Sequence, residues 1–201
     1  MKTAIYGIGN ILMGDDGIGP AVVRYLASLP LPPDVTLEDL GTPSLDLPAY
    51  LIGYDRVIFI DAVALDAPPG TVRVFSRDEI TSVPTGIRVS PHEPTLNDAL
   101  IVLDFAGTAP REVVLVGVVP ETLEGGMRLS PRVAGAVGRA GEVVSALIVD
   151  GLAAPHVPSR ARAHRRETSV AESAVLSGAS LDLRDRFRSG DRYDAAWFRR
   201  G

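Results

Sequence analysis

The chain has 201 residues, of which 46% are hydrophobic and 5% aromatic, and it contains no cysteine. This length suits one domain with an appendage, and the hydrophobic fraction is sufficient for a buried core. The lack of cysteine excludes disulfides, thiolate metal sites and cysteine nucleophiles. Residues 1–150 carry 10 basic and 19 acidic residues, a charge of −9, whereas residues 151–201 carry 10 and 6, a charge of +4. The acidic main body argues against a nucleic-acid-binding protein.

In chain order, the apolar patterns predict alternating strands and helices. Strands are expected at residues 4–6, 35–40, 56–61, 71–75 and 112–119, and helices at residues 17–29, 45–52, 95–105 and 130–148. Ser130 is the expected N-cap of the last helix, with Pro131 at its first position. This order predicts an α/β fold, a three-layer sandwich with a mostly parallel twisted central sheet flanked by helices.

Residues 151–201 differ from the rest of the chain because they are rich in arginine and show little periodicity. We therefore predict a domain over residues 1–150 and a C-terminal extension over residues 151–201. Within the extension we expect a linker at residues 151–166 and short helices at residues 170–176 and 191–199, the remainder being partly disordered.

The N-terminus does not show the pattern of a secretory signal. Its first apolar run is short and is interrupted by Gly7, Gly9 and Asn10. No run of about 20 apolar residues follows that could span a membrane. We therefore expect a cytoplasmic protein.

Acidic residues and one histidine follow the predicted strands at positions where ligands bind in such sheets. Asp15 and Asp16 follow the first strand; one of them is expected to cap the next helix and the other to be functional. Asp61 ends the most apolar strand, where it either bonds nearby backbone amides or faces a ligand. His92 lies between Pro91 and Pro94 in a rigid loop, which suits a positioned ligand or base.

Taken together, two carboxylates and one imidazole form an O,O,N ligand set. Such a set leaves positions open on a divalent metal, which then polarises a carbonyl or binds a water. A nucleotide loop is the alternative, although Gly7 and Gly9 are followed by a third glycine only at Gly14, so the dinucleotide motif is not met. Asp39 at the end of the second strand is available for a ribose, which keeps a non-catalytic nucleotide-binding module open.

Several segments, in this order, resemble the motifs of the hydrogenase maturation endopeptidases. They are GIGNILMGDDGIG at 7–19, GTPSLDL at 41–47, IDA at 60–62, SPHE at 90–93 and GVVPE at 117–121, followed by the helix start at Leu129 and Ser130. The resemblance covers about residues 2–150, so that the predicted N-terminal domain is a hydrogenase maturation protease domain. The extension resembles nothing in the family.

The resemblance implies an endopeptidase that removes the C-terminal extension of a nickel–iron hydrogenase large-subunit precursor after nickel insertion. The family's metal-contacting and catalytic positions fall on Asp16, Asp61 and His92. Its substrate-recognition segment falls on Asp39, Gly41 and Thr42.

The same resemblance implies that nickel is carried by the substrate's own cysteines. Two Asp and one His lack the soft ligands that hold nickel tightly, so no tightly bound metal is expected in the resting enzyme. Either the metal or a carboxylate acting as base activates the water. A chaperone that binds the precursor without cutting it is a further alternative, for which the basic extension suits an acidic partner surface.

Overall fold

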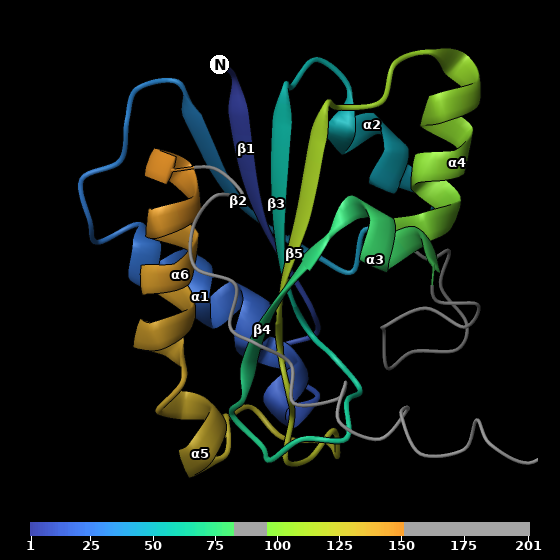
Figure 1. The fold of residues 1–201 in the computed structure, drawn as a ribbon. Coiled ribbons are helices and arrows are strands. Elements are labelled where there is room, and N and C mark those ends of the chain that lie inside the picture. The colour runs from blue at the N-terminus through green and yellow to red at the C-terminus, as the bar shows by residue number, and fades with distance from the viewer. Residues whose placement is uncertain (83–95, 151–201) are drawn as a thin grey trace, which may run out of the picture. The chain divides into compact units, whose positions relative to one another are not determined.

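The computed structural model describes residues 1–82 and 96–150, which fold around one five-stranded sheet (Figure 1). The strand order is β2-β1-β3-β5-β4. Four strands run parallel, namely β1 (Thr3–Ile8), β2 (Val35–Gly41), β3 (Arg56–Ala62) and β5 (Glu112–Val118), whereas β4 (Val72–Ser76) runs antiparallel to β5. The predicted mostly parallel sheet is therefore confirmed.

Helices cover both faces of the sheet (Figure 1), as predicted for a three-layer sandwich. One face packs against α1 (Ile18–Leu26), α5 (Pro131–Ala134) and α6 (Val137–Asp150). The other face packs against α2 (Leu47–Leu51), α3 (Arg77–Ser82) and α4 (Leu96–Ala106). Two short 3₁₀ turns, η1 (Gly14–Gly17) and η2 (Ser44–Asp46), precede α1 and α2.

The central strand β3 is covered by helices on both faces, which accounts for its continuous apolar sequence. All of its residues are buried. Val57 and Phe59 belong to the hydrophobic cluster on one face, and Ile58 and Ile60 to the cluster on the other. A strand covered on both faces has no solvent-facing side, so polar residues do not alternate with apolar ones.

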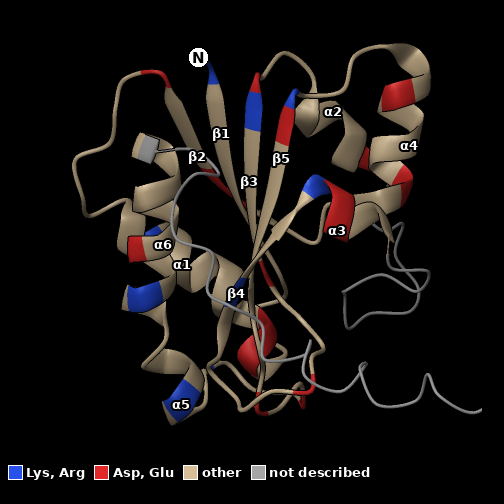
Figure 2. Ribbon diagram, in the orientation of Figure 1, with Lys and Arg blue, Asp and Glu red and all other residues tan. Residues whose placement is uncertain are grey.

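The amino ends of β3 and β5 are joined by a partly buried ion pair. The Nε of Arg56 lies 2.5 Å from Oε2 of Glu112, and the same guanidinium donates to the carbonyl of Leu147 in α6 at 2.8 Å. In Figure 2 the starts of these two strands are blue and red, side by side at the upper edge of the sheet. The pair thus anchors α6 at the edge opposite the strands' carboxyl ends.

One predicted helix was wrong in extent. Residues 130–148 form two helices, α5 and α6, separated by Gly135 and Ala136. The N–H of Ala136 donates to the carbonyl of Val133, three residues back, which tightens the turn and ends α5. Glycine lowers helix propensity, so Gly135 favours a break here. Ser130 does occupy the N-cap position, but its side chain makes no capping hydrogen bond.

The first helix also ends earlier than predicted. It closes at Leu26, and Leu29 lies beyond it and is 37% exposed. The prolines at 30, 32 and 33 follow, so the helix ends before the first proline rather than running up to it. None of the helices in the described part of the chain is long and apolar enough to cross a membrane.

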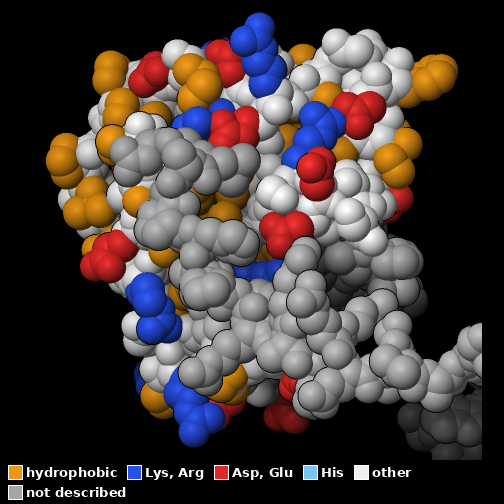
Figure 3. Space-filling view, viewed as in Figure 1, with side chains coloured by type: hydrophobic (Ala, Val, Ile, Leu, Met, Phe, Trp, Pro, Cys, Tyr) orange, Lys and Arg blue, Asp and Glu red, His pale blue; other side chains and the backbone are white. Residues whose placement is uncertain are grey.

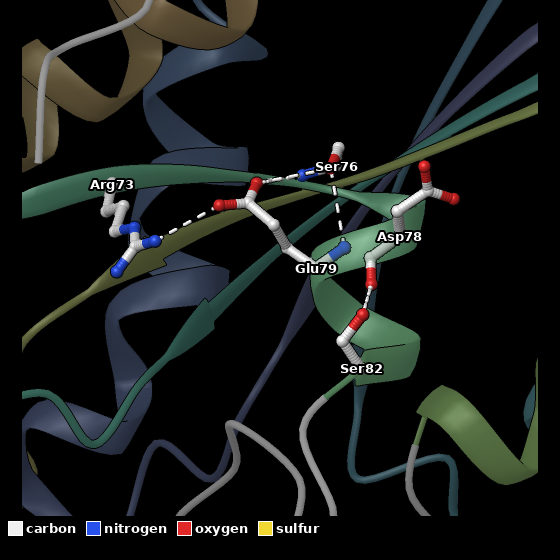
Figure 4. A network of polar contacts seen from close by, with 5 residues as sticks. All are labelled: Arg73, Ser76, Asp78, Glu79 and Ser82. Atoms are coloured by element: carbon white, nitrogen blue, oxygen red, sulfur yellow. Dashed lines mark hydrogen bonds and ion pairs between the residues drawn. The ribbon is translucent and has the colours of Figure 1, made fainter. Parts of the chain in front are cut away.

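Helix α3 was not predicted, although its start carries a capping box (Figure 4). The N–H of Ser76 donates to Oε2 of Glu79 at 3.0 Å, and the N–H of Glu79 lies 3.4 Å from the Ser76 hydroxyl. Arg73 holds the other oxygen of Glu79 at 3.1 Å. Burial would raise the pKa of Glu79, but these donors outweigh it and lower that pKa. The S-x-x-E spacing is a sequence signal for this helix.

The division between a domain and an extension stays a prediction. Residues 151–201, with the expected linker and the two short helices, lie outside the described residues.

Candidate active site at the carboxyl edge of the sheet

The loop that follows β1 closes on itself and fixes Asp16. Asn10 donates its N–H to Oδ2 of Asp16 at 2.6 Å, and Met13 donates its N–H to the Asn10 carbonyl at 3.0 Å. Asp16 in turn donates its own N–H to the Met13 carbonyl at 3.1 Å. Gly9 makes this closure possible, because it has φ +136° and a Cβ there would lie 1.8 Å from the Asp16 carbonyl oxygen.

Helix α1 begins in direct contact with the ends of two strands. A Cβ on Gly19 would lie 2.2 Å from the carbonyl oxygen of Ile8 in β1 and 2.6 Å from that of Ile60 in β3. Glycine is therefore required for this close approach. The contact brings η1, which carries Asp16, against β3, whose second-last residue is Asp61.

Asp61 lies at the carboxyl edge, as predicted. In the register of the sheet Ile60 pairs with Gly7 of β1, and Asp61 pairs with Gly117 of β5. The Asp61 carboxylate is buried, and its Oδ1 accepts the N–H of Ala62 at 2.8 Å. The structure thus places Asp16, in the loop after β1, and Asp61, near the end of β3, at the carboxyl end of the sheet, while their chemical roles stay predictions.

His92 lies in residues 83–95, outside the described residues, so its place beside the two acids stays a prediction. The described chain gives only the elements on either side of it. Helix α3 ends at Ser82 and α4 begins at Leu96, and both pack on the same face of the sheet. Within residues 1–82 and 96–150 no group of three His, Asp or Glu is placed to hold a metal.

The predicted substrate-recognition segment lies at the end of β2, next to the Asp16 loop. Gly9 donates its N–H to the Gly41 carbonyl at 2.9 Å, and the register shifts between Gly7 and Ile8 where the two strands end. Oδ1 of Asp39 accepts the Gly41 N–H at 3.0 Å. Thr42 is exposed. The segment therefore borders the edge that carries Asp16.

Asp15 has a structural role that the sequence did not reveal. Its carboxylate is fully buried and accepts backbone N–H bonds from Glu121 at 2.8 Å, Thr122 at 3.0 Å and Ser130 at 2.6 Å. Burial raises its pKa, but these three donors outweigh burial and lower the pKa. Neither η1 nor α1 has a side-chain cap, so the expected helix-capping role was wrong.

In three-layer α/β proteins ligands bind outside the carboxyl ends of the strands, and in this chain Asp16 and Asp61 lie there, which is the position of the active site in α/β enzymes. The sequence model described as "Hydrogenase maturation protease" matches residues 20–147. The chain is 36% identical over 150 residues to the hydrogenase 2 maturation protease of Escherichia coli (strain K12), covering 74% of this chain and 91% of that protein. It is 38% identical to the hydrogenase expression/formation protein HoxM of Azotobacter vinelandii, over 60% of this chain and 58% of HoxM.

Solved structures agree with this result. The hydrogenase maturating endopeptidase HybD from E. coli superposes with a TM-score of 0.68 at 36% identity, over 74% of this chain and 93% of that one. The hydrogenase 2 maturation peptidase from Thaumarchaeota archaeon SCGC_AB-539-E09 gives a TM-score of 0.58 at 35% identity, over 74% and 98%.

The chain belongs to the hydrogenase maturation protease family and is an endopeptidase. The match of the family's sequence model includes Asp61 and begins just after Asp16. The two non-catalytic alternatives, a nucleotide-binding module and a chaperone that binds the precursor without cutting it, are therefore not favoured. The geometry also opposes a dinucleotide site, because Asp15 and Asp16 lie just before α1, where a diphosphate would need positive potential.

Proposed function

We propose that this endopeptidase removes the C-terminal extension of a nickel–iron hydrogenase large-subunit precursor once nickel has been inserted. Asp16, Asp61 and His92 would contact the nickel that the precursor carries, and so test whether the metal is present. The observation that carries the proposal is that Asp16, in the loop after β1, and Asp61, near the end of β3, lie on contacting elements at the carboxyl end of the sheet. The proposal includes action in the cytoplasm.

The donor chemistry supports recognition of a metal that another protein holds. Carboxylate and imidazole complete the coordination of a metal, but without thiolates they hold nickel weakly. Asp39, Gly41 and Thr42 at the end of β2 would contact the precursor beside the metal. Cleavage then depends on a water activated either by the nickel or by one of the two carboxylates acting as a base.

The test compares nickel-loaded and nickel-free forms of the cognate precursor, with the loss of the C-terminal peptide followed by mass spectrometry. Wild-type protein is expected to cleave only the loaded form. Equal cleavage of both forms would reject metal recognition, and cleavage of neither would reject the activity.

Amide variants test the residues with little disturbance of the fold. An asparagine at 16 or 61 keeps an oxygen that can accept the N–H of Asn10 or Ala62. Asp16→Asn, Asp61→Asn and His92→Ala are each expected to reduce cleavage by at least 100-fold, on the order of the loss of one acid–base or charge-stabilising group. The exposed Asp34→Asn is the matched control and should cleave normally. Full activity of His92→Ala would remove that histidine from the site.

A further inference from the structure

Large apolar side chains are exposed on the two loops that follow β1 and β5. Ile11, Leu12 and Met13 are 47%, 55% and 40% exposed, and Met127 is 79% exposed. We call these four side chains the apolar rim. Contact between water and apolar surface is unfavourable, and a group of such side chains on one part of the surface is typical of a site where another molecule binds.

Backbone hydrogen bonds hold the two loops of the rim together. Gly14 donates its N–H to the Gly126 carbonyl at 2.8 Å, and Gly126 donates its N–H to the Leu12 carbonyl at 2.9 Å. The buried carboxylate of Asp15 fixes the same two loops to each other. The rim is therefore preorganised, which lowers the entropy lost when a partner binds.

The rim belongs to the same closed loop as Asp16. The N–H of Asp16 donates to the Met13 carbonyl, and the N–H of Leu12 donates to Oδ1 of Asn10 at 2.9 Å. A molecule that covers Ile11, Leu12 and Met13 therefore lies on the loop that carries Asp16, whose carboxylate is bonded to the N–H of Asn10. In Figure 2 acidic segments mark this lower end of the sheet, on the loops that contain η1 and follow β5.

We propose that the apolar rim binds an apolar segment of the hydrogenase precursor next to the bond that is cut. This inference rests on the proposed function. The size of the rim supports a short segment rather than a second copy of this chain, because a stable interface takes about 20–30 residues on each side. A second copy seated on the rim would also cover Asp16.

The test measures cleavage of nickel-loaded precursor by full-length Leu12→Ser and Met127→Ser over a range of precursor concentrations. Each variant is expected to lower kcat/KM by about tenfold, the scale for an apolar side chain that is buried on binding. The loss should come from a higher KM, with kcat within about twofold of wild type, because the rim binds substrate without touching the reacting atoms. The unfolding midpoint should not change.

Phe105→Ser is the matched control. Phe105 is 96% exposed on α4, where hydrophobic side chains also show on the surface (upper right in Figure 3), and its replacement should leave KM unchanged. Wild-type KM in both rim variants, or a fall in kcat alone, would overturn the rim proposal while leaving the proposed function intact. A wild-type protein that fails to cleave loaded precursor overturns the proposed function instead.

Light scattering tests whether a second copy of this chain, rather than the precursor, occupies the rim. The wild-type chain is expected to have the same mass as Leu12→Ser at the concentration of the assay. A wild-type dimer that Leu12→Ser converts to a monomer would assign the rim to a second copy and overturn the proposal.

Discussion

Asp15 and Ser130 lie 115 residues apart in the sequence, yet Oδ1 of Asp15 accepts the backbone N–H of Ser130 at 2.6 Å. Together with the bonds from Glu121 and Thr122, this contact joins the loop after β1 to the loop after β5. Asp16, the neighbour of Asp15, thus belongs to a loop that is fixed both by its own hydrogen bonds and by those of Asp15 to the loop after β5. Of the two neighbouring acids, Asp15 therefore joins the loops structurally, whereas the role of Asp16 in the chemistry stays a prediction.

The first prediction concerns Asp15→Asn. Both carboxylate oxygens accept N–H groups, so an amide must turn its own NH₂ toward at least one buried donor. We expect the free energy of unfolding to fall by about 2–4 kcal/mol, measured by urea denaturation. Asp34→Asn, at an exposed ion pair with the N-terminus, should change it by no more than about 1 kcal/mol. Equal effects of the two variants would contradict the structural role of Asp15.

The second prediction is a pH dependence of the same contact. The pKa of Asp15 is lower in the folded protein than in the unfolded chain, because the three N–H donors favour the charged carboxylate. Its contribution to stability is therefore complete above the unfolded pKa of about 3.9 and is lost as pH falls through the folded value.

The difference in stability between wild type and Asp15→Asn should accordingly be constant from about pH 5 to pH 7 and shrink below about pH 4. Urea denaturation at several pH values measures it. A difference that grows on acidification would show that the pKa of Asp15 is raised rather than lowered.

The third prediction concerns Gly19→Ala. The new Cβ would overlap the carbonyl oxygens of Ile8 and Ile60, both of which are strand backbone and cannot move without breaking the sheet. We expect a loss of about 3 kcal/mol or more, seen as a lower thermal midpoint or as insoluble protein. Gly138→Ala on α6 is the control, since nothing lies within 4 Å of its Cβ position. That variant should be neutral or stabilised by up to about 1 kcal/mol.

The fourth prediction separates stability from activity. Glu112→Gln leaves the guanidinium of Arg56, which is 9% exposed, without its charged partner at the amino edge of the sheet. We expect the free energy of unfolding to fall by about 1–3 kcal/mol, with kcat/KM for the precursor unchanged. Glu142→Gln, an exposed position on α6, should change neither quantity. A loss of activity in folded Glu112→Gln protein would mean that this pair also shapes the site.

The strands of the sheet could be predicted from the sequence because runs of apolar residues coincide with the strands that are buried. The run from Arg56 to Asp61 has no polar residue inside it, and β3 is buried on both faces. The break between α5 and α6 was less visible, because the apolar spacing continues through Gly135 and a glycine only weakens a helix. The start of α3 was predictable from Ser76 and Glu79, but the helix is too short to show a helical period.

The candidate site was only partly predictable, for a physical reason. Asp16 and Asp61 follow strands, so their place at the carboxyl edge comes directly from the topology. The role of Asp15 could not be predicted, because its partners are backbone N–H groups of residues 121, 122 and 130, and any residue other than proline supplies those.

The ion pair of Arg56 with Glu112 lies at the amino ends of β3 and β5, whereas Asp61 lies at the carboxyl end of β3 and Asp16 in the loop after β1. Changes at the amino ends of these strands can therefore alter resistance to heat without touching the residues expected to contact substrate. A stronger contact at the amino ends would offset part of the stability lost when exposed residues of the loops at the carboxyl ends are exchanged, provided that Asp15 and Gly19 are kept.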